Sequence, residues 1–206
     1  MGGRMSGTAS GAPRRQRADA VANRARVLAA AREVFTERGG RASLNEVAKR
    51  AAVGPGTVYR HFPTLQALLV DLVRGDVERV CQRGRELATH EDPDTGLRIW
   101  LREFAAHACA MQGLLAAQLA VEFAPGDGNA LAACHDALVA TAGELLDRSK
   151  RSGTTPPTVD APDLLRLVNA IAWASQQAPD DTDLIDRLLA ISLGVGAARP
   201  QPSGSL

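Results

Sequence analysis

Aromatic side chains are scarce in this sequence: four Phe, two Trp and one Tyr make up 3% of its 206 residues. A core built from the remaining apolar residues relies on Leu, Val and Ala. Leu- and Ala-rich sequence with few β-branched runs favours helix. No segment shows the alternation of apolar and polar residues that predicts a strand. We therefore expect an all-α protein.

Cysteine is also scarce, and the three cysteines, Cys81, Cys109 and Cys134, are far apart. No Cys or Cys/His cluster has zinc spacing, so we expect neither a metal nor another cofactor. An odd cysteine count without a secretory signal fits a reducing cytoplasm. No apolar run approaches the roughly 20 residues that span a bilayer. We expect a cytoplasmic protein without a membrane partner.

Positive charge is concentrated near the N-terminus. Residues 1–62 contain twelve Arg and Lys against four Asp and Glu, a net charge of +8, and the remaining residues carry −7. Such asymmetry indicates a polyanionic partner, and phosphate neutralisation supplies most non-specific affinity for nucleic acid. From charge alone, a solvated basic surface is an equal alternative.

The N-terminal segment predicts an arm followed by a helix. Residues 1–17 are rich in Gly, Ser and Arg and have little to bury, so we expect a disordered basic arm. From about residue 19 to residue 38, apolar residues recur on one helical face. Gly39 and Gly40 are a helix stop.

Two short helices and a turn follow. Ser43 and Glu46 form an S-x-x-E capping box, which predicts that Ser43 begins a helix. Residues 53–56, VGPG, predict a turn. Residues 57–62 then form a short helix that Pro63 ends.

The rest of the chain predicts further helices separated by segments rich in Gly, Pro and Asp. We expect about nine in all, the later ones near 65–89, 95–111, 114–123, 129–151, 161–177 and 182–195. The expected organisation is an arm (1–17), a three-helix helix-turn-helix domain (18–64), a larger helical domain (65–196) and a disordered tail (197–206).

The stretch GPGTVYRHF, residues 54–62, has one apolar and one polar face when placed on a helix. Val58 and Phe62 face inward. A short capped helix, a turn and a second helix with a polar face is the helix-turn-helix layout, whose second helix enters the DNA major groove. Arg60 is suited to guanine, which accepts two hydrogen bonds from arginine. Side chains suited to phosphate are Thr57, Tyr59 and His61, and Pro55 and Gly56 allow close approach to a base.

The run SLNEVAKRAAVGPGTVYRHFPTLQALL, preceded by RVLAAAREVFTERG, resembles the DNA-binding domain of the TetR family of transcriptional regulators over about residues 20–72. The resemblance implies a helical dimer whose N-terminal domain binds a near-palindromic operator and whose C-terminal domain binds an inducer. It implies phosphate contacts from Ser43, Thr57, Tyr59 and His61, and places Pro55, Gly56 and Arg60 nearest the bases.

One position departs from that family's pattern. Members usually have a phosphate-binding lysine early in the fourth helix, where this sequence has Leu65. We expect that contact to be missing. An arm containing Arg14, Arg15 and Arg17 is a candidate replacement, reaching phosphate or the minor groove; a solubilising tail is the alternative.

The larger domain contains a candidate effector pocket. Trp100, Phe104, His107 and Met111 form one helical stripe, which is typical of a core but also of a pocket wall. The predicted pocket adds Phe123, Trp173 and Gln176, giving an apolar cavity with few polar groups for a small apolar or aromatic molecule.

The last two helices carry more apolar surface than one core requires, which predicts a two-fold dimer interface. Its expected residues are Leu164, Val168, Ile171, Leu184, Leu188, Ile191 and Val195. A helix pair buried within a monomer is the alternative.

The favoured function is a dimeric DNA-binding regulator, with repression as the default of the family. A constitutive or architectural DNA-binding protein without a ligand is one alternative. A small helical enzyme is less favoured, since His107 and Cys109 point about 200° apart on a helix and form no nucleophile–base pair.

Overall fold

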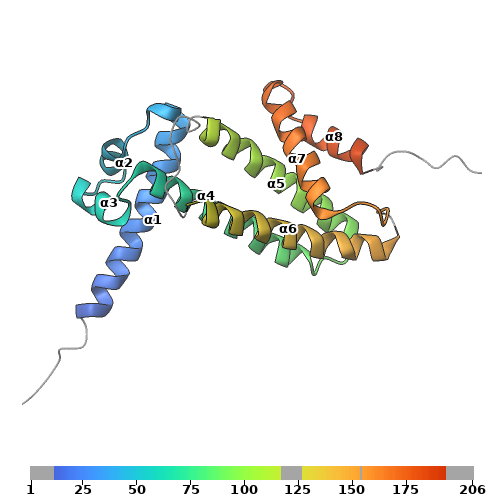
Figure 1. The fold of residues 1–206 in the computed structure, drawn as a ribbon, viewed down its shortest axis with the longest axis horizontal. Helices are drawn as coiled ribbons and strands as arrows, with labels where there is room; N and C mark the ends of the chain where they lie inside the picture. The colour runs from blue at the N-terminus through green and yellow to red at the C-terminus, as the bar shows by residue number, and fades with distance from the viewer. Residues whose placement is uncertain (1–11, 117–126, 154, 194–206) are drawn as a thin grey trace, which may run out of the picture. The chain divides into compact units, whose positions relative to one another are not determined.

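A computed structural model describes residues 12–116, 127–153 and 155–193. This part contains eight α-helices and one short 3-10 turn, Gly39–Arg41, and no strand, which confirms the all-α prediction (Figure 1). The expected count of about nine helices is close. No helix in the described part has both the length and the apolarity that a membrane crossing requires.

The first compact unit contains α1 (Ala12–Arg38), α2 (Leu44–Arg50), α3 (Pro55–His61) and the start of α4 (Leu65–Leu87). Helix α1 packs against both short helices. The core of this unit is mostly aliphatic: Val27, Ala31, Val34, Phe35, Leu44, Val47, Val58, Phe62, Leu68 and Leu72.

Helix α1 begins seven residues earlier than the apolar pattern predicted, at Ala12 instead of Asp19. Residues 12–17, expected in the disordered arm, therefore lie in a helix. Arg and Gln are good helix formers, and a helix needs no apolar face to extend beyond its packed part. Residues 1–11 lie outside the described part.

The boundary between the two units falls inside α4, between Leu72 and Val73, and not at the start of α4 as expected. The second unit contains the rest of α4 with α5 (Pro93–Ala116), α6 (Asp127–Ser152), α7 (Ala161–Gln176) and α8 (Leu184–Ser192). Its core joins residues from all five helices, including Val77, Trp100, Leu145, Val168 and Leu189.

The predicted break between helices 95–111 and 114–123 is wrong, because α5 continues through Gly113 to Ala116. A single glycine costs a helix only about 1 kcal/mol relative to alanine, which tertiary packing easily offsets. The predicted helix 114–123 lies mostly outside the described residues, as do the predicted tail, 197–206, and Val195.

Helices α4, α5 and α6 meet closely at Gly84. A Cβ atom there would lie 2.2 Å from Thr141 Cγ2 on α6 and 2.9 Å from Trp100 Nε1 on α5. The Trp100 indole is fully buried and donates a hydrogen bond to the Val80 carbonyl at 2.9 Å. The close approach therefore depends on the absence of a side chain at this position.

Gly84→Ala should lower the free energy of unfolding by about 1–3 kcal/mol, because overpacking displaces Thr141 and the indole. Gly75→Ala on the same helix is the matched control, since nothing lies within 4 Å of its Cβ position. That control should raise stability by about 0.5–1 kcal/mol through helix propensity. Denaturant unfolding followed by circular dichroism measures both, and equal effects would contradict the packing described here.

Candidate nucleic-acid interface and ligand cavity

Ser43 begins α2 as the capping box predicted. Its hydroxyl accepts a hydrogen bond from the Glu46 amide at 3.3 Å and donates one to Glu46 Oε2 at 2.9 Å. The backbone at Ser43 is extended, which is usual for an N-cap. The hydroxyl that the family resemblance assigns to phosphate is thus engaged with Glu46 in this structure.

The turn between α2 and α3 begins before the predicted residues 53–56. Ala52 has the left-handed backbone conformation, with φ 53°. Gly54 has an ordinary φ of −65° and is the N-cap of α3, and Pro55 takes the first helical position. Helix α3 therefore begins at Pro55, two residues earlier than predicted.

Helix α3 divides its residues as the sequence predicted. Val58 and the adjoining Phe62 are buried, while Pro55, Gly56 and Arg60 are exposed. The side chain of Tyr59 is 46% exposed, and Thr57 and His61 are partly exposed. All six predicted contact residues of this stretch lie on one short element, and their DNA roles stay predictions.

Arg60 folds back on its own helix. Its Nε atom donates to the Gly56 carbonyl at 3.1 Å. Within the described part of the chain, Arg60, Lys49 and Arg41 form no ion pair. These exposed cations are therefore not held in ion pairs.

Two other cations of the first unit, Arg38 and Arg24, are paired with acidic neighbours. Arg38 Nε lies 3.8 Å from Glu46 Oε1. The guanidinium of Arg24 pairs with the buried carboxylate of Asp71 on α4 and lies 5.7 Å from the centroid of the Phe62 ring. Fewer positive charges are therefore available to bind phosphate than the net charge of residues 1–62 suggests.

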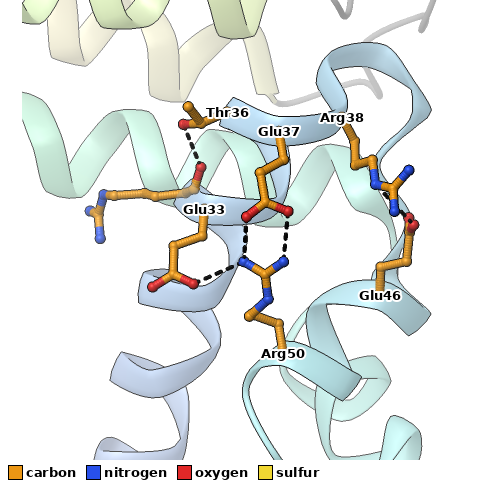
Figure 2. A network of polar contacts seen from close by, with 7 residues as sticks. Glu33, Thr36, Glu37, Arg38, Glu46 and Arg50 are labelled. Atoms are coloured by element: carbon orange, nitrogen blue, oxygen red, sulfur yellow. Dashed lines mark hydrogen bonds and ion pairs between the residues drawn. The ribbon is translucent and has the colours of Figure 1, made fainter.

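A cluster of ion pairs joins α2 to α1 at Arg50 (Figure 2). Arg50 donates to both carboxylate oxygens of Glu37, at 2.9 and 2.7 Å, and to Glu33 at 3.0 Å. The hydrogen bond from Arg50 lowers the pKa of Glu37, and the same contacts raise the pKa of Arg50. We call Arg50, Glu37 and Glu33 the α1–α2 clamp.

Leu65 is the first residue of α4 and is partly buried. Thr64 precedes it, and its hydroxyl oxygen accepts from the Ala67 amide at 3.0 Å. An apolar side chain here offers phosphate no donor. Arg14, Arg15 and Arg17 belong to the first turns of α1, and their side chains lie outside the described part.

Trp100 belongs to the core and not to a ligand cavity, which corrects the predicted pocket. Its ring is stacked on Phe104, with centroids 5.6 Å apart and planes 6° from parallel. Full burial against α4 leaves it no surface for a ligand. A helical stripe cannot separate core from cavity wall, because both require apolar residues at the same spacing.

Phe104 and His107 do line a cavity, of about 330 Å³, within the second unit. Burial lowers the pKa of His107, which outweighs the opposite influence of the nearby Asp76 carboxylate. This imidazole is therefore neutral at pH 7 and supplies one donor and one acceptor.

The other predicted pocket residues lie elsewhere. Trp173 is 60% exposed and outside the cavity lining. Gln176 Nε2 donates to the Cys109 carbonyl at 2.6 Å, so this amide ties α7 to α5. The side chains of Met111 and Phe123 lie outside the described part.

Sequence reasoning missed most of the cavity wall, whose residues come from α4, α5, α6 and α7. The missed residues are Val73, Val77, Ala108, Leu131, Cys134, His135, Leu138, Pro162, Leu165, Arg166 and Asn169. Those on α7 follow an i, i+3, i+4, i+7 spacing, which is a recognisable helical face. Nothing in the spacing indicates that this face borders a cavity.

Three predicted dimer residues are buried in the chain's own core: Leu164, Val168 and Ile171. This corrects their assignment, since they have no surface left for a second copy. Leu184 and Leu188 are partly buried, and Ile191 is 75% exposed. The large exposed apolar residues of α7 are Leu167 and Trp173.

Among the described residues, no group of three His, Cys, Asp or Glu side chains is placed to hold a metal ion. The three cysteines are all free thiols. Burial raises the pKa values of Cys109 and Cys134, which keeps both protonated and poorly nucleophilic at pH 7.

Two family models match the sequence. The model described as bacterial regulatory proteins, tetR family, matches residues 27–72. The model described as transcriptional regulator SbtR-like, C-terminal domain, matches residues 92–194. The two matches fall on the helix-turn-helix segment and on most of the second unit.

Individual relatives agree with these matches. The regulator UidR of Escherichia coli strain K12 is 42% identical over 69 residues, 33% of this chain and 35% of UidR, so the alignment spans about a third of that relative. The repressor KstR of Rhodococcus jostii strain RHA1 is 29% identical over 190 residues, 86% of each chain.

A solved structure is similar over nearly its whole length. The TetR transcription regulatory protein of Mycobacterium vanbaalenii is 33% identical, with a TM-score of 0.68, over 87% of this chain and 98% of that one. Its likeness spans both units, as the two family matches do. The chain belongs to the TetR family of bacterial transcriptional regulators.

Proposed function

We propose that this regulator is a cytoplasmic homodimer that represses transcription from a palindromic operator and is released by a small molecule bound in the cavity of its second unit. DNA contact is assigned to α3, with Arg60 as the base reader. Thr57, Tyr59 and His61 bind phosphate, and Pro55 and Gly56 permit close approach. The 86% coverage of the repressor KstR supports repression over activation.

The observation that carries this proposal is the continuity of α4. Residues up to Leu72 pack in the DNA-binding unit, whereas Val73 and Val77, on the next turns, line the cavity. A ligand that moves these two residues acts on a helix that also packs in the first unit. Differential ligand affinity for two positions of α4 is what such a switch requires.

A dimer is supported by the exposed apolar surface of α7 and α8. Leu167 and Ile191 line one groove, with Val159 and Leu193 in its wall. Side chains of this kind, uncovered in a single chain, indicate a protein interface. Two copies related by a two-fold axis would present two α3 helices to a palindromic site.

DNA selection from a random pool tests the function. The wild-type protein should enrich a palindrome with half-sites about one helical turn apart, or a multiple of that spacing. Arg60→Ala should then lower affinity for the selected DNA about tenfold or more and relax the preference at one base pair per half-site.

Thr57→Val is the matched control for base reading. Loss of a phosphate contact should weaken binding to selected and scrambled DNA by similar factors, at fixed salt. No enriched palindrome with the wild-type protein would contradict the proposed function. Uniform weakening by Arg60→Ala would contradict only the assignment of Arg60.

The α1–α2 clamp can be tested by whether Glu37→Gln strengthens or weakens DNA binding. Glu37→Gln removes a negative charge near the DNA, which by charge alone should strengthen binding. If the clamp instead holds α2 and α3 in the position that binds DNA, Glu37→Gln should weaken binding to the selected DNA about two- to fivefold. Loss of a surface ion pair has an effect of this size.

Asp19→Asn is the charge-matched control for Glu37→Gln, because Asp19 is exposed on the same helix and forms no ion pair within the described part. It should leave affinity unchanged or slightly higher. Fluorescence anisotropy at fixed ionic strength measures both variants. Tighter binding by Glu37→Gln would rule out a positioning role for the clamp.

The dimer interface is tested by Ile191→Asp and Leu167→Asp, which place charge on the exposed apolar surface. Each should convert the dimer to a monomer at micromolar concentration, measured by light scattering after size exclusion. Val21→Asp is the control, since Val21 on α1 is 69% exposed against 75% for Ile191. A wild-type monomer, or variants that stay dimeric, would contradict this interface.

A further inference from the structure

The polar groups around the ligand cavity share one property. These polar residues are His107 on α5, His135 on α6, and Arg166 and Asn169 on α7, besides the Cys134 thiol. All four carry N–H donors, and the cavity lining in the described part of the chain contains no Asp or Glu. A ligand that brings its own acceptors or negative charge therefore meets complementary groups.

The polar and apolar groups are separated by burial. Phe104, Leu138 and Leu165 in the lining are buried, whereas His135, Arg166 and Asn169 are exposed. The cavity thus has an apolar floor and a polar, cationic rim. This separation suits an amphipathic ligand whose charged end stays near solvent.

Arg166 has a partner that an anion can replace. Its Nη1 atom lies 2.5 Å from Asp163 Oδ1, and the two side chains are 75% and 70% exposed. Asp163 lines the separate groove that contains Leu167, and not the ligand cavity. Exposed ion pairs of this kind contribute little stability. Replacing the Asp163 carboxylate by that of a ligand at Arg166 therefore costs little free energy.

The deeper part of the cavity does not provide a second charge. Burial keeps the His107 imidazole neutral, as its lowered pKa indicates. The acidic group that influences it, Asp76, is bound to Arg79 at 2.5 Å. A ligand with a single charged end, placed at the rim, therefore fits better than one charged at both ends.

We propose that the effector is a small amphipathic monocarboxylate. Its apolar body packs against Phe104, Val77 and Leu138, and its carboxylate binds Arg166 at the rim. A planar guanidinium matches a carboxylate with two parallel hydrogen bonds. The volume of about 330 Å³ lies at the small end for ligand pockets, about 300–1,000 Å³, which favours a compact body.

This inference rests on the proposed function, because it names the ligand of the same cavity. Titration calorimetry of the full-length protein should compare matched pairs of probes: decanoate with decanamide, and 2-naphthoate with 2-naphthamide. Each acid and its amide share an apolar body and differ in charge. We expect at least one acid to bind about tenfold or more tightly than its amide.

Two variants test whether the rim residues cause the tighter binding of the acids. Arg166→Met should weaken acid binding about tenfold and leave amide binding unchanged, since a charge-assisted bidentate contact is lost. Asp163→Asn should tighten acid binding, because the competing carboxylate is removed. Arg187→Met is the control: Arg187 pairs with Asp181 at 2.8 Å in a similarly exposed setting and lies outside the lining.

The outcomes distinguish failure of the monocarboxylate from failure of the effector cavity. Equal affinities for acids and amides, unaffected by Arg166→Met, would overturn the monocarboxylate while leaving a neutral effector in the same cavity. No binding by any probe at millimolar concentration would overturn both the monocarboxylate and the effector cavity. Retained binding to the selected DNA in those samples would show that the DNA-reading assignment stands independently.

Discussion

Burial of Val58 and Phe62 is the constraint on which the proposed DNA-reading surface of α3 depends. Helix α3 has seven residues, and an isolated helix of that length is unstable in water. Its position is therefore set by the two side chains that pack inward. Once they are fixed, the spacing of the helix turns Thr57, Tyr59 and Arg60 outward together.

Phe62 also connects this helix to its neighbours. The Arg24 guanidinium of α1 lies over its ring and pairs with Asp71 of α4. Cation and ring attract each other at this distance, and the partial burial of Asp71 strengthens the ion pair. A displacement of α4 thus acts on a contact shared by α1 and the end of α3. The proposed coupling of a ligand at Val73 and Val77 to α3 would act through this contact.

Local chemistry made the first unit predictable from sequence. The capping box at Ser43 and the inward spacing of Val58 and Phe62 are short-range signals, and both are confirmed. The left-handed conformation of Ala52 was not predicted, because glycine is the residue that usually adopts it. The clamp joining Arg50 to Glu33 and Glu37 was missed because these partners lie 17 and 13 residues away.

The second unit was less predictable because its roles depend on three-dimensional packing. Trp100 and Phe104 occupy the same helical stripe, yet one is core and the other lines a cavity. Leu164 and Leu167 are one turn apart, yet the first is buried and the second exposed. The spacing of apolar residues identifies an apolar helix face. Whether that face becomes core, cavity wall or exposed surface depends on how the neighbouring helices pack.

The most direct measurement is the structure of the protein bound to its selected DNA. The account predicts that α3 lies in the major groove and that Arg60 leaves the Gly56 carbonyl to donate to a base edge. Val58 and Phe62 should remain buried. A complex in which α3 lies outside the groove, with Arg60 still bonded to Gly56, would contradict it.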